Sequence, residues 1–397
     1  MSAVRRRRVF YIPGYDPIPP RRYRELYRKE AAAQARISGH EIALTPSQGK
    51  GRFGWGVAAR IEGQAVEAEV TVLVWSDIVK GSMAQGILAT YAQLIRTAAT
   101  YIGTGALFRL MRLRKGPVIA ALYPVGFLLA QLGLALLAGW LLGRGLVFVH
   151  PLAGWAGLLV VPLVLEGFRR LDGRFFAYYL MHDYAYSARY LGGNPPELEA
   201  RMAEFCEAIA EALQGDCDEV LVVGHSSGAH LAVTVLADLI RAGRVPEGGP
   251  ALGFLSLGQV VPMVSFLPRA WRLRADLEYL STRGELFWLD VTAPGDGCAF
   301  ALCDPVAVSG VAPEGKRWPL VISAAFTQTL SAARWRALRW RFFRLHFQYL
   351  CAFEHPNGYD YFAITAGPAT LAARFEGRAP SPARIERAVS GYRSTAP

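Results

Sequence analysis

Short apolar blocks alternate with amphipathic stretches along most of the chain. Apolar runs at 9–15, 57–61, 66–75, 219–223, 252–257, 286–291 and 320–325 are typical of buried strands. Residues 21–37 form a charged helical segment, and residues 196–213 and 227–242 carry apolar side chains at helical spacing. Strands that alternate with helices predict an α/β fold, in which helices cover both faces of a mostly parallel sheet.

Two long apolar runs interrupt this pattern. Residues 117–143 contain no charged residue and one strongly polar residue, Gln131, while residues 146–165 form a second run that ends before Glu166. A bilayer core is spanned by about 20 apolar helical residues, so both runs are long enough. The alternative is a pair of buried core helices, which two adjacent runs of this length disfavour. The sequence therefore predicts a transmembrane helical hairpin.

Basic residues flank both ends of this hairpin and predict its orientation. Before it stand Arg109, Arg112, Arg114 and Lys115, after it stand Arg169, Arg170 and Arg174, and the turn carries Arg144 alone. The positive-inside rule places both ends in the cytoplasm. We expect an integral protein, of a bacterial cytoplasmic membrane, with its α/β part on the cytosolic side. The bilayer is its expected partner.

The hairpin divides the chain into four segments. Residues 1–81 are the N-terminal part of the α/β domain, and residues 82–174 are a membrane-associated insertion. Within that insertion, the apolar stretch 82–111 is interrupted by Arg96, and we expect it to lie along the membrane surface, where Arg112 and Arg114 can contact lipid phosphates. Residues 175–380 complete the α/β domain. Residues 381–397 form a polar tail, predicted to be partly disordered.

Composition narrows the choice of partners. The formal net charge of +11 would suit nucleic acid, but the arginines border apolar segments, and no RNA-binding motif or zinc-ligand spacing is present. We therefore predict no nucleic-acid partner. The five cysteines are an odd number without a C-x-x-C pair, which fits reduced thiols better than disulfides. The oligomeric state is not indicated.

The stretch LVVGHSSGAHLAV at 221–233 carries a G-x-S-x-G motif between a predicted strand and a predicted helix. In such a turn the serine is exposed on a strained bend, and the two glycines let neighbouring backbone approach closely. The motif predicts Ser226 as a nucleophile. The amide of Ser227, at the positive end of the helix, can face a developing oxyanion. The alternative is an ordinary glycine-rich turn.

Because of this motif, the chain resembles the α/β-hydrolase fold family. The resemblance covers the whole chain except the hairpin and its flanks. The resemblance implies a triad in the chain order Ser, acid, His. For the acid we favour Asp296, in the turn after an apolar strand, over Asp290 and Asp304. For the base we favour His346, since the spacing of His346 and Tyr349 resembles a segment of lipase-like members. His355 remains an alternative.

The resemblance also implies a second oxyanion amide after an early strand. The segment YIPGYDP at 11–17 offers the amide of Tyr15, although Pro13 stands where the family has a histidine. A simple Pro-Gly turn is the alternative. Neither a metal nor an organic cofactor is implied by this chemistry.

Together these features predict a membrane-anchored serine hydrolase that cleaves an acyl ester or thioester, with a lipid or other apolar acyl substrate. An acyltransferase would use the same triad, and the sequence does not separate the two. A membrane scaffold that retains the fold without catalysis is a further alternative, which the presence of serine, acid and histidine disfavours.

Overall fold

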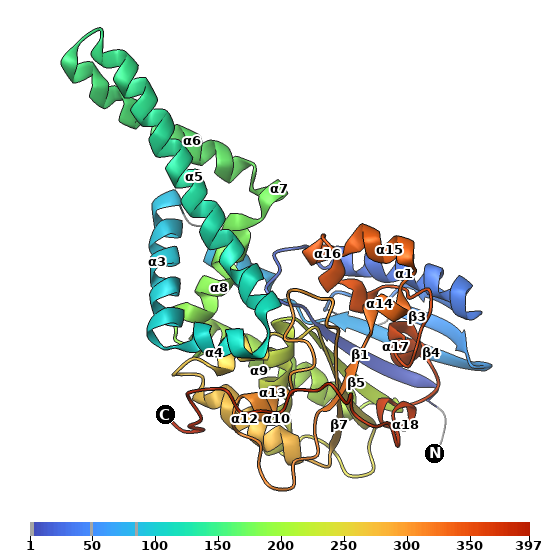
Figure 1. The fold of residues 1–397 in the computed structure, drawn as a ribbon. Coiled ribbons are helices and arrows are strands. Elements are labelled where there is room, and N and C mark those ends of the chain that lie inside the picture. The colour runs from blue at the N-terminus through green and yellow to red at the C-terminus, as the bar shows by residue number, and fades with distance from the viewer. Residues whose placement is uncertain (1–3, 48–50, 84–85) are drawn as a thin grey trace.

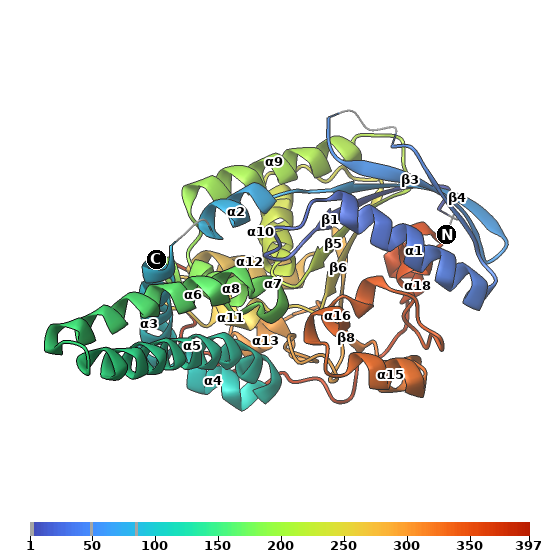
Figure 2. The ribbon, with the colours of Figure 1, turned by 90° about the horizontal axis from the view of Figure 1, so that it is seen from above.

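The computed structural model describes residues 4–47, 51–83 and 86–397. Within these residues the strands form one eight-stranded sheet in the order β2-β3-β4-β1-β5-β6-β7-β8 (Figure 1, Figure 2). From β4 to β8 in this order neighbours are parallel, whereas β3 is antiparallel to β2 and β4. The predicted α/β class with a mostly parallel sheet is confirmed. The strands are β1 (Arg6–Ile12), β2 (Glu41–Thr45), β3 (Gly54–Ile61), β4 (Gln64–Val72), β5 (Glu219–His225), β6 (Ala251–Leu257), β7 (Leu286–Thr292) and β8 (Leu320–Ser323).

Helices cover both faces of the sheet, so neighbouring residues of a central strand enter different cores. Val9 of β1 lies in the core shared with α1 (Arg21–Ser38) and α17 (Tyr361–Ala366), and Phe10 lies in the core shared with α9, α10 and α12. This burial on both sides explains the continuous apolar runs of the strands. The remaining helices of the α/β part are α9 (Pro196–Leu213), α10 (Gly228–Arg241), α11 (Val261–Ser265), α12 (Trp271–Thr282), α13 (Pro305–Val308), α14 (Phe326–Thr329), α15 (Ala332–Leu338), α16 (Phe342–His346), η2 (Gln348–Leu350) and α18 (Leu371–Arg374).

The antiparallel edge of the sheet differs from the sequence prediction. Strand β2 is not predicted, because it is only five residues long and none of them is fully buried. Strands β3 and β4 form a hairpin whose turn residues, Glu62 and Gly63, both have positive φ, as two-residue hairpins require. The N-terminal strand β1 is central, since it pairs with both β4 and β5.

In the insertion, α5 (Lys115–Val147), η1 (Pro151–Leu159) and α6 (Val160–Arg170) form a long arm that projects from the α/β part (Figure 1, Figure 2). In the described residues, two segments are long and apolar enough to cross a membrane, Lys115–Val147 and Pro151–Arg170. Most of their apolar side chains are exposed, and 22% and 11% of the two apolar stretches are buried. The elements are α2 (Ser76–Met83), α3 (Ile87–Gly103), α4 (Ala106–Leu113), α5 (Lys115–Val147), η1 (Pro151–Leu159), α6 (Val160–Arg170), α7 (Asp172–Phe175) and α8 (Ala177–Arg189).

The turn of the hairpin lies later than predicted. The predicted spans, 117–143 and 146–165, place the break at Arg144, but α5 continues through this residue to Val147. The break comes at 148–150, because Pro151 begins the second segment and His150 Nδ1 accepts a hydrogen bond from the Leu152 amide. Close helix contact is possible because glycines face each other: a Cβ on Gly157 would lie 2.2 Å from the Gly139 carbonyl oxygen.

Two flanking features also differ from expectation. Arg114, expected to contact lipid phosphates, donates a hydrogen bond to the Ala301 carbonyl at 2.8 Å and so ties α5 to the α/β part. The tail at 381–397 is packed rather than disordered. Ile385 donates to Leu302, and Val389 donates to Val308. These backbone bonds are long-range, which is why local composition does not reveal them.

Candidate active site

The G-x-S-x-G segment forms a sharp turn between β5 and α10. Strand β5 ends at His225, α10 begins at Gly228, and Ser226 lies between them with φ of 57°. This left-handed conformation is costly for a residue with a side chain and is found where surrounding structure enforces it. The Ser226 amide donates to the Leu257 carbonyl at 2.9 Å, which holds the bend against β6.

Close backbone contacts explain the glycines around this serine. A Cβ on Gly228 would lie 2.1 Å from the Ile12 carbonyl oxygen, and one on Gly224 would lie 2.7 Å from the Ala229 Cα. Gly14, in the turn after β1, also abuts the serine, since a Cβ there would lie 2.9 Å from the Ser226 Cβ. Three glycines from two segments therefore make room for one serine.

The predicted acid and base are hydrogen-bonded to each other. Asp296, in the turn after β7, lies with Oδ2 2.7 Å from Nδ1 of His346 at the end of α16. The same Oδ2 accepts a hydrogen bond from the Tyr349 hydroxyl at 3.0 Å, and Oδ1 accepts from the Cys298 amide at 2.9 Å. Burial acts to raise the pKa of Asp296, but the charge and hydrogen bond of His346 and the two other donors outweigh it and lower the pKa.

Ser226 and His346 line the same cavity. Tyr15, Ser227 and Asp183 also line this cavity. His346 Nε2 is buried and, among the described residues, has no hydrogen-bond partner. The bond to Ser226 is thus not formed, as is common for catalytic pairs before substrate binds. The free nitrogen of the histidine is the one that a general base requires.

The two predicted oxyanion amides reach this cavity from adjacent strands. Ile12 pairs with Gly224, so the turns that carry Tyr15 and Ser227 start at the same level of the sheet. Both residues line the cavity. In the described part of the chain neither backbone amide donates a hydrogen bond to protein. Two unengaged N–H groups beside a serine can bind a developing oxyanion.

The alternative acid and base candidates lie elsewhere. His355 is exposed in a loop and is absent from the walls of the cavity. Asp290, inside β7, accepts a hydrogen bond from Ser256 at 2.6 Å. Asp304 caps α13 and pairs with Lys316 at 2.6 Å. The structure therefore brings Ser226, Asp296 and His346 together, and it does not bring the alternatives to them.

Three further residues of the site were not assigned from the sequence. His225 Nε2 lies 3.0 Å from the His346 carbonyl oxygen, and burial lowers the pKa of His225 to about 3, so the ring is neutral and donates. Tyr349 binds Asp296, as described above. Asp183, on α8, faces the cavity, and burial raises its pKa to about 7. His225 and Tyr349 sit inside recognisable motifs, whereas nothing in the local sequence marks Asp183.

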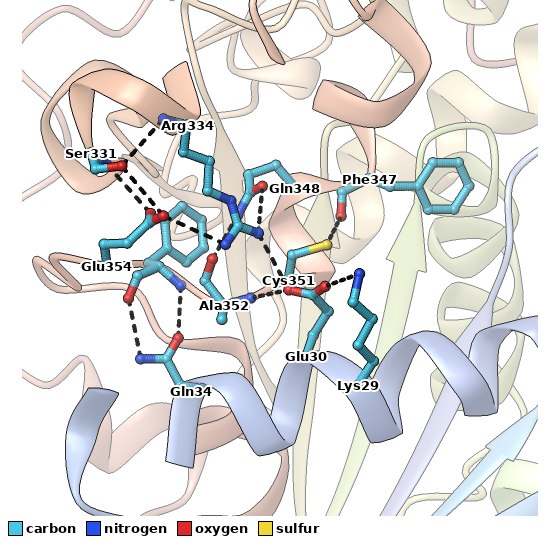
Figure 3. A network of polar contacts seen from close by, with 11 residues as sticks. Lys29, Glu30, Gln34, Ser331, Arg334, Phe347, Gln348, Cys351, Ala352 and Glu354 are labelled. Atoms are coloured by element: carbon cyan, nitrogen blue, oxygen red, sulfur yellow. Dashed lines mark hydrogen bonds and ion pairs between the residues drawn. The ribbon is translucent and has the colours of Figure 1, made fainter. Parts of the chain in front are cut away.

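A polar network attaches the segment after His346 to helix α1 (Figure 3). Glu30 accepts a hydrogen bond from the Ala352 amide at 3.1 Å, and Gln34 accepts one from the Phe353 amide at 2.8 Å. Arg334 lies 3.3 Å from Glu30 and 3.6 Å from Glu354. These contacts fix the backbone that carries the histidine, so the first helix of the chain supports the base from outside the cavity.

Asp296, Cys298 and His346 are close enough to one another to be considered as metal ligands. Ligand atoms of Asp296, Cys298 and His346 lie within 4.8 Å of one another. Burial, together with the charge of Asp296, raises the pKa of the Cys298 thiol well above its ordinary value. The direct Asp–His hydrogen bond favours the triad.

No protein-family model, no curated protein and no solved structure matches the chain. Function is therefore inferred from the chemistry of the site.

Proposed function

We propose that the protein is a membrane-anchored serine hydrolase that cleaves an acyl ester or thioester of a lipid. The main observation is that His346, which is hydrogen-bonded to Asp296, lines the same cavity as Ser226. The three residues occur in the chain order expected from the α/β-hydrolase resemblance. Serine and acid follow β5 and β7, while the histidine comes after β8, the last strand. The parallel sheet with helices on both faces supports the same resemblance.

The reaction follows from these positions. His346 Nε2 accepts the proton of Ser226 Oγ, which attacks the substrate carbonyl, while the amides of Tyr15 and Ser227 bind the oxyanion. Collapse breaks the bond to the alcohol or thiol, which leaves with the proton from His346, and the acyl group remains on Ser226. Water then attacks the acyl-enzyme and gives its proton to His346, which passes it to Ser226 Oγ as the bond to the acyl group breaks and the acid is released. Asp296 holds the imidazole in the required tautomer and stabilises its cation.

Two surfaces support membrane attachment. The exposed apolar arm is one, and the positive-inside rule assigns its two ends to the cytosolic side. The other is the segment 336–344, which precedes the catalytic histidine and exposes Trp340 (73%) and Phe342 (48%). Its arginines are also exposed: Arg336, Arg339, Arg341 and Arg344. Phe343, in the same segment, packs against Phe176 at 5.0 Å, near the base of the arm. Arginine and tryptophan together are suited to anionic lipid headgroups.

Labelling with a fluorophosphonate probe tests the proposal directly. Intact protein in detergent should label, and Ser226→Ala should not. Ser187→Ala is the matched control, because this second serine lines the same cavity and should leave labelling unchanged. A folded wild-type protein that does not label, as a scaffold without catalysis would behave, contradicts the proposal. Product analysis with an added alcohol then distinguishes hydrolysis from acyl transfer.

A further inference from the structure

A second cavity lies within the insertion, next to the catalytic one. It is lined by residues of α3, α4, α5, α8 and α11. Its walls are formed mainly by aliphatic side chains, among them Leu110, Val118, Val125 and Met181. A polar ligand would leave its hydrogen-bonding groups unpaired here, so the lining suits a hydrocarbon.

The two cavities share part of their walls. Tyr101, Tyr184 and Met263 line both of them. The Tyr101 hydroxyl donates to the Met263 carbonyl at 2.9 Å, which joins α3 to the turn after β6. The side chain of Met263 is unbranched and flexible, so it can move aside for a chain that passes from one cavity to the other.

The second cavity reaches the outer surface of the insertion. Two of its lining side chains, Ile102 on α3 and Leu122 on α5, are also 51% and 45% exposed. Leu122 lies on α5, the helix that continues into the arm. An apolar molecule in the bilayer can therefore meet the cavity without crossing water.

We propose that this second cavity binds the acyl chain of the substrate, with the ester carbonyl at Ser226 and the chain running between Tyr101, Tyr184 and Met263. This inference rests on the proposed hydrolase function and specifies its substrate class, esters or thioesters of long unbranched fatty acids. Each methylene added to the acyl chain, until the cavity is full, should then raise kcat/KM by roughly fourfold.

Two neighbouring alanines on α3 allow a matched test. Ala98 lines the second cavity, whereas Ala99 is exposed. Ala98→Phe fills the cavity, and it should lower kcat/KM for p-nitrophenyl palmitate by at least about tenfold while acetate hydrolysis stays within about twofold. Ala99→Phe should change neither. Ala121→Phe fills the same cavity from α5 and replaces Ala98→Phe if that variant does not fold.

The outcomes separate this inference from the function on which it rests. A wild-type enzyme that labels with fluorophosphonate and hydrolyses acetate and palmitate esters equally well overturns the acyl-chain site and leaves the hydrolase intact. Equal losses on both esters in Ala98→Phe and Ala121→Phe, with stability retained, also overturn it. Absence of labelling and of all ester hydrolysis contradicts the proposed function itself.

Discussion

Removing the Tyr349 hydroxyl tests whether the triad acid is positioned by this residue. In the structure the hydroxyl donates to Asp296 Oδ2 at 3.0 Å and accepts from the Ala293 amide, also at 3.0 Å. Tyr349→Phe deletes both bonds and keeps the ring, which packs against Phe326 at 4.9 Å between centroids. The substitution therefore changes hydrogen bonding with little change in packing volume.

The expected magnitudes follow from the two lost bonds. Hydrogen bonds to a charged group contribute about 1.5–3 kcal/mol, and His346 and Cys298 still bind the carboxylate, so we expect kcat/KM to fall by about tenfold. The buried Ala293 amide loses its acceptor, which should lower the free energy of unfolding by about 1–3 kcal/mol. Because the Tyr349 hydrogen bond helps to lower the pKa of Asp296, that pKa should rise in the variant.

The assay is kcat/KM of a p-nitrophenyl ester across acid pH, with urea denaturation of the same samples. Asp296 must be ionised to orient His346, so activity of the variant should be lost at higher pH than in the wild type. Tyr359→Phe is the control, since its buried hydroxyl binds the Tyr349 carbonyl and not the acid. An unchanged acid limb in Tyr349→Phe, or an equal shift in Tyr359→Phe, would refute the assigned role.

Three further predictions concern the strand acid, the oxyanion turn and the arginine surface. Burial raises the pKa of Asp290 from 3.8 to about 8, so the folded chain keeps a proton that the unfolded chain loses. The free energy of unfolding of the wild type should therefore fall as pH rises, by about 1.4 kcal/mol per pH unit between these values. Because Asp290→Asn removes the titrating group, urea denaturation should show that the stability of this variant relative to the wild type increases toward pH 8. Gly14→Ala, whose Cβ would meet the nucleophile, should abolish fluorophosphonate labelling while circular dichroism stays unchanged. In phosphatidylglycerol proteoliposomes at low salt, Arg336→Glu with Arg339→Glu should speed amide hydrogen exchange in the segment 336–344 more than Arg387→Glu does, and unchanged exchange would exclude this surface.

Local patterns predict the central elements of the fold but not its edges. Helix α9 begins and ends where its apolar spacing predicts, because its inner face alone decides its length. The turn of the arm is misplaced at Arg144, since a charge does not stop a helix whereas Pro151 does. Strand β2 is short and has no fully buried residue, and the tail is held by backbone bonds to residues distant in sequence, so local pattern predicts neither.

In the candidate site, sequence motifs reveal the proposed triad residues more easily than they reveal the residues that position the triad. Ser226 is marked by glycines that the backbone contacts require, and Asp296 by its turn after a strand. The preference for His346 over His355 depends on tertiary position, which chain order alone leaves open. Asp183 reaches the cavity from α8, the last helix of the insertion, so its place follows only from how the insertion packs.

The central place of β1 has a consequence for the order in which the protein matures. This strand is synthesised first, yet its β5 edge stays open until Glu219–His225 is made, long after the arm. At translation rates of about 5–20 residues per second, the roughly 180 residues from α6 to His346 take about ten to thirty-five seconds. In a chain anchored as proposed, the arm therefore enters the bilayer before the nucleophile has a base. If the proposed hydrolase function holds, the enzyme would become active only after its arm is attached, which would protect lipids of other membranes from the newly made chain.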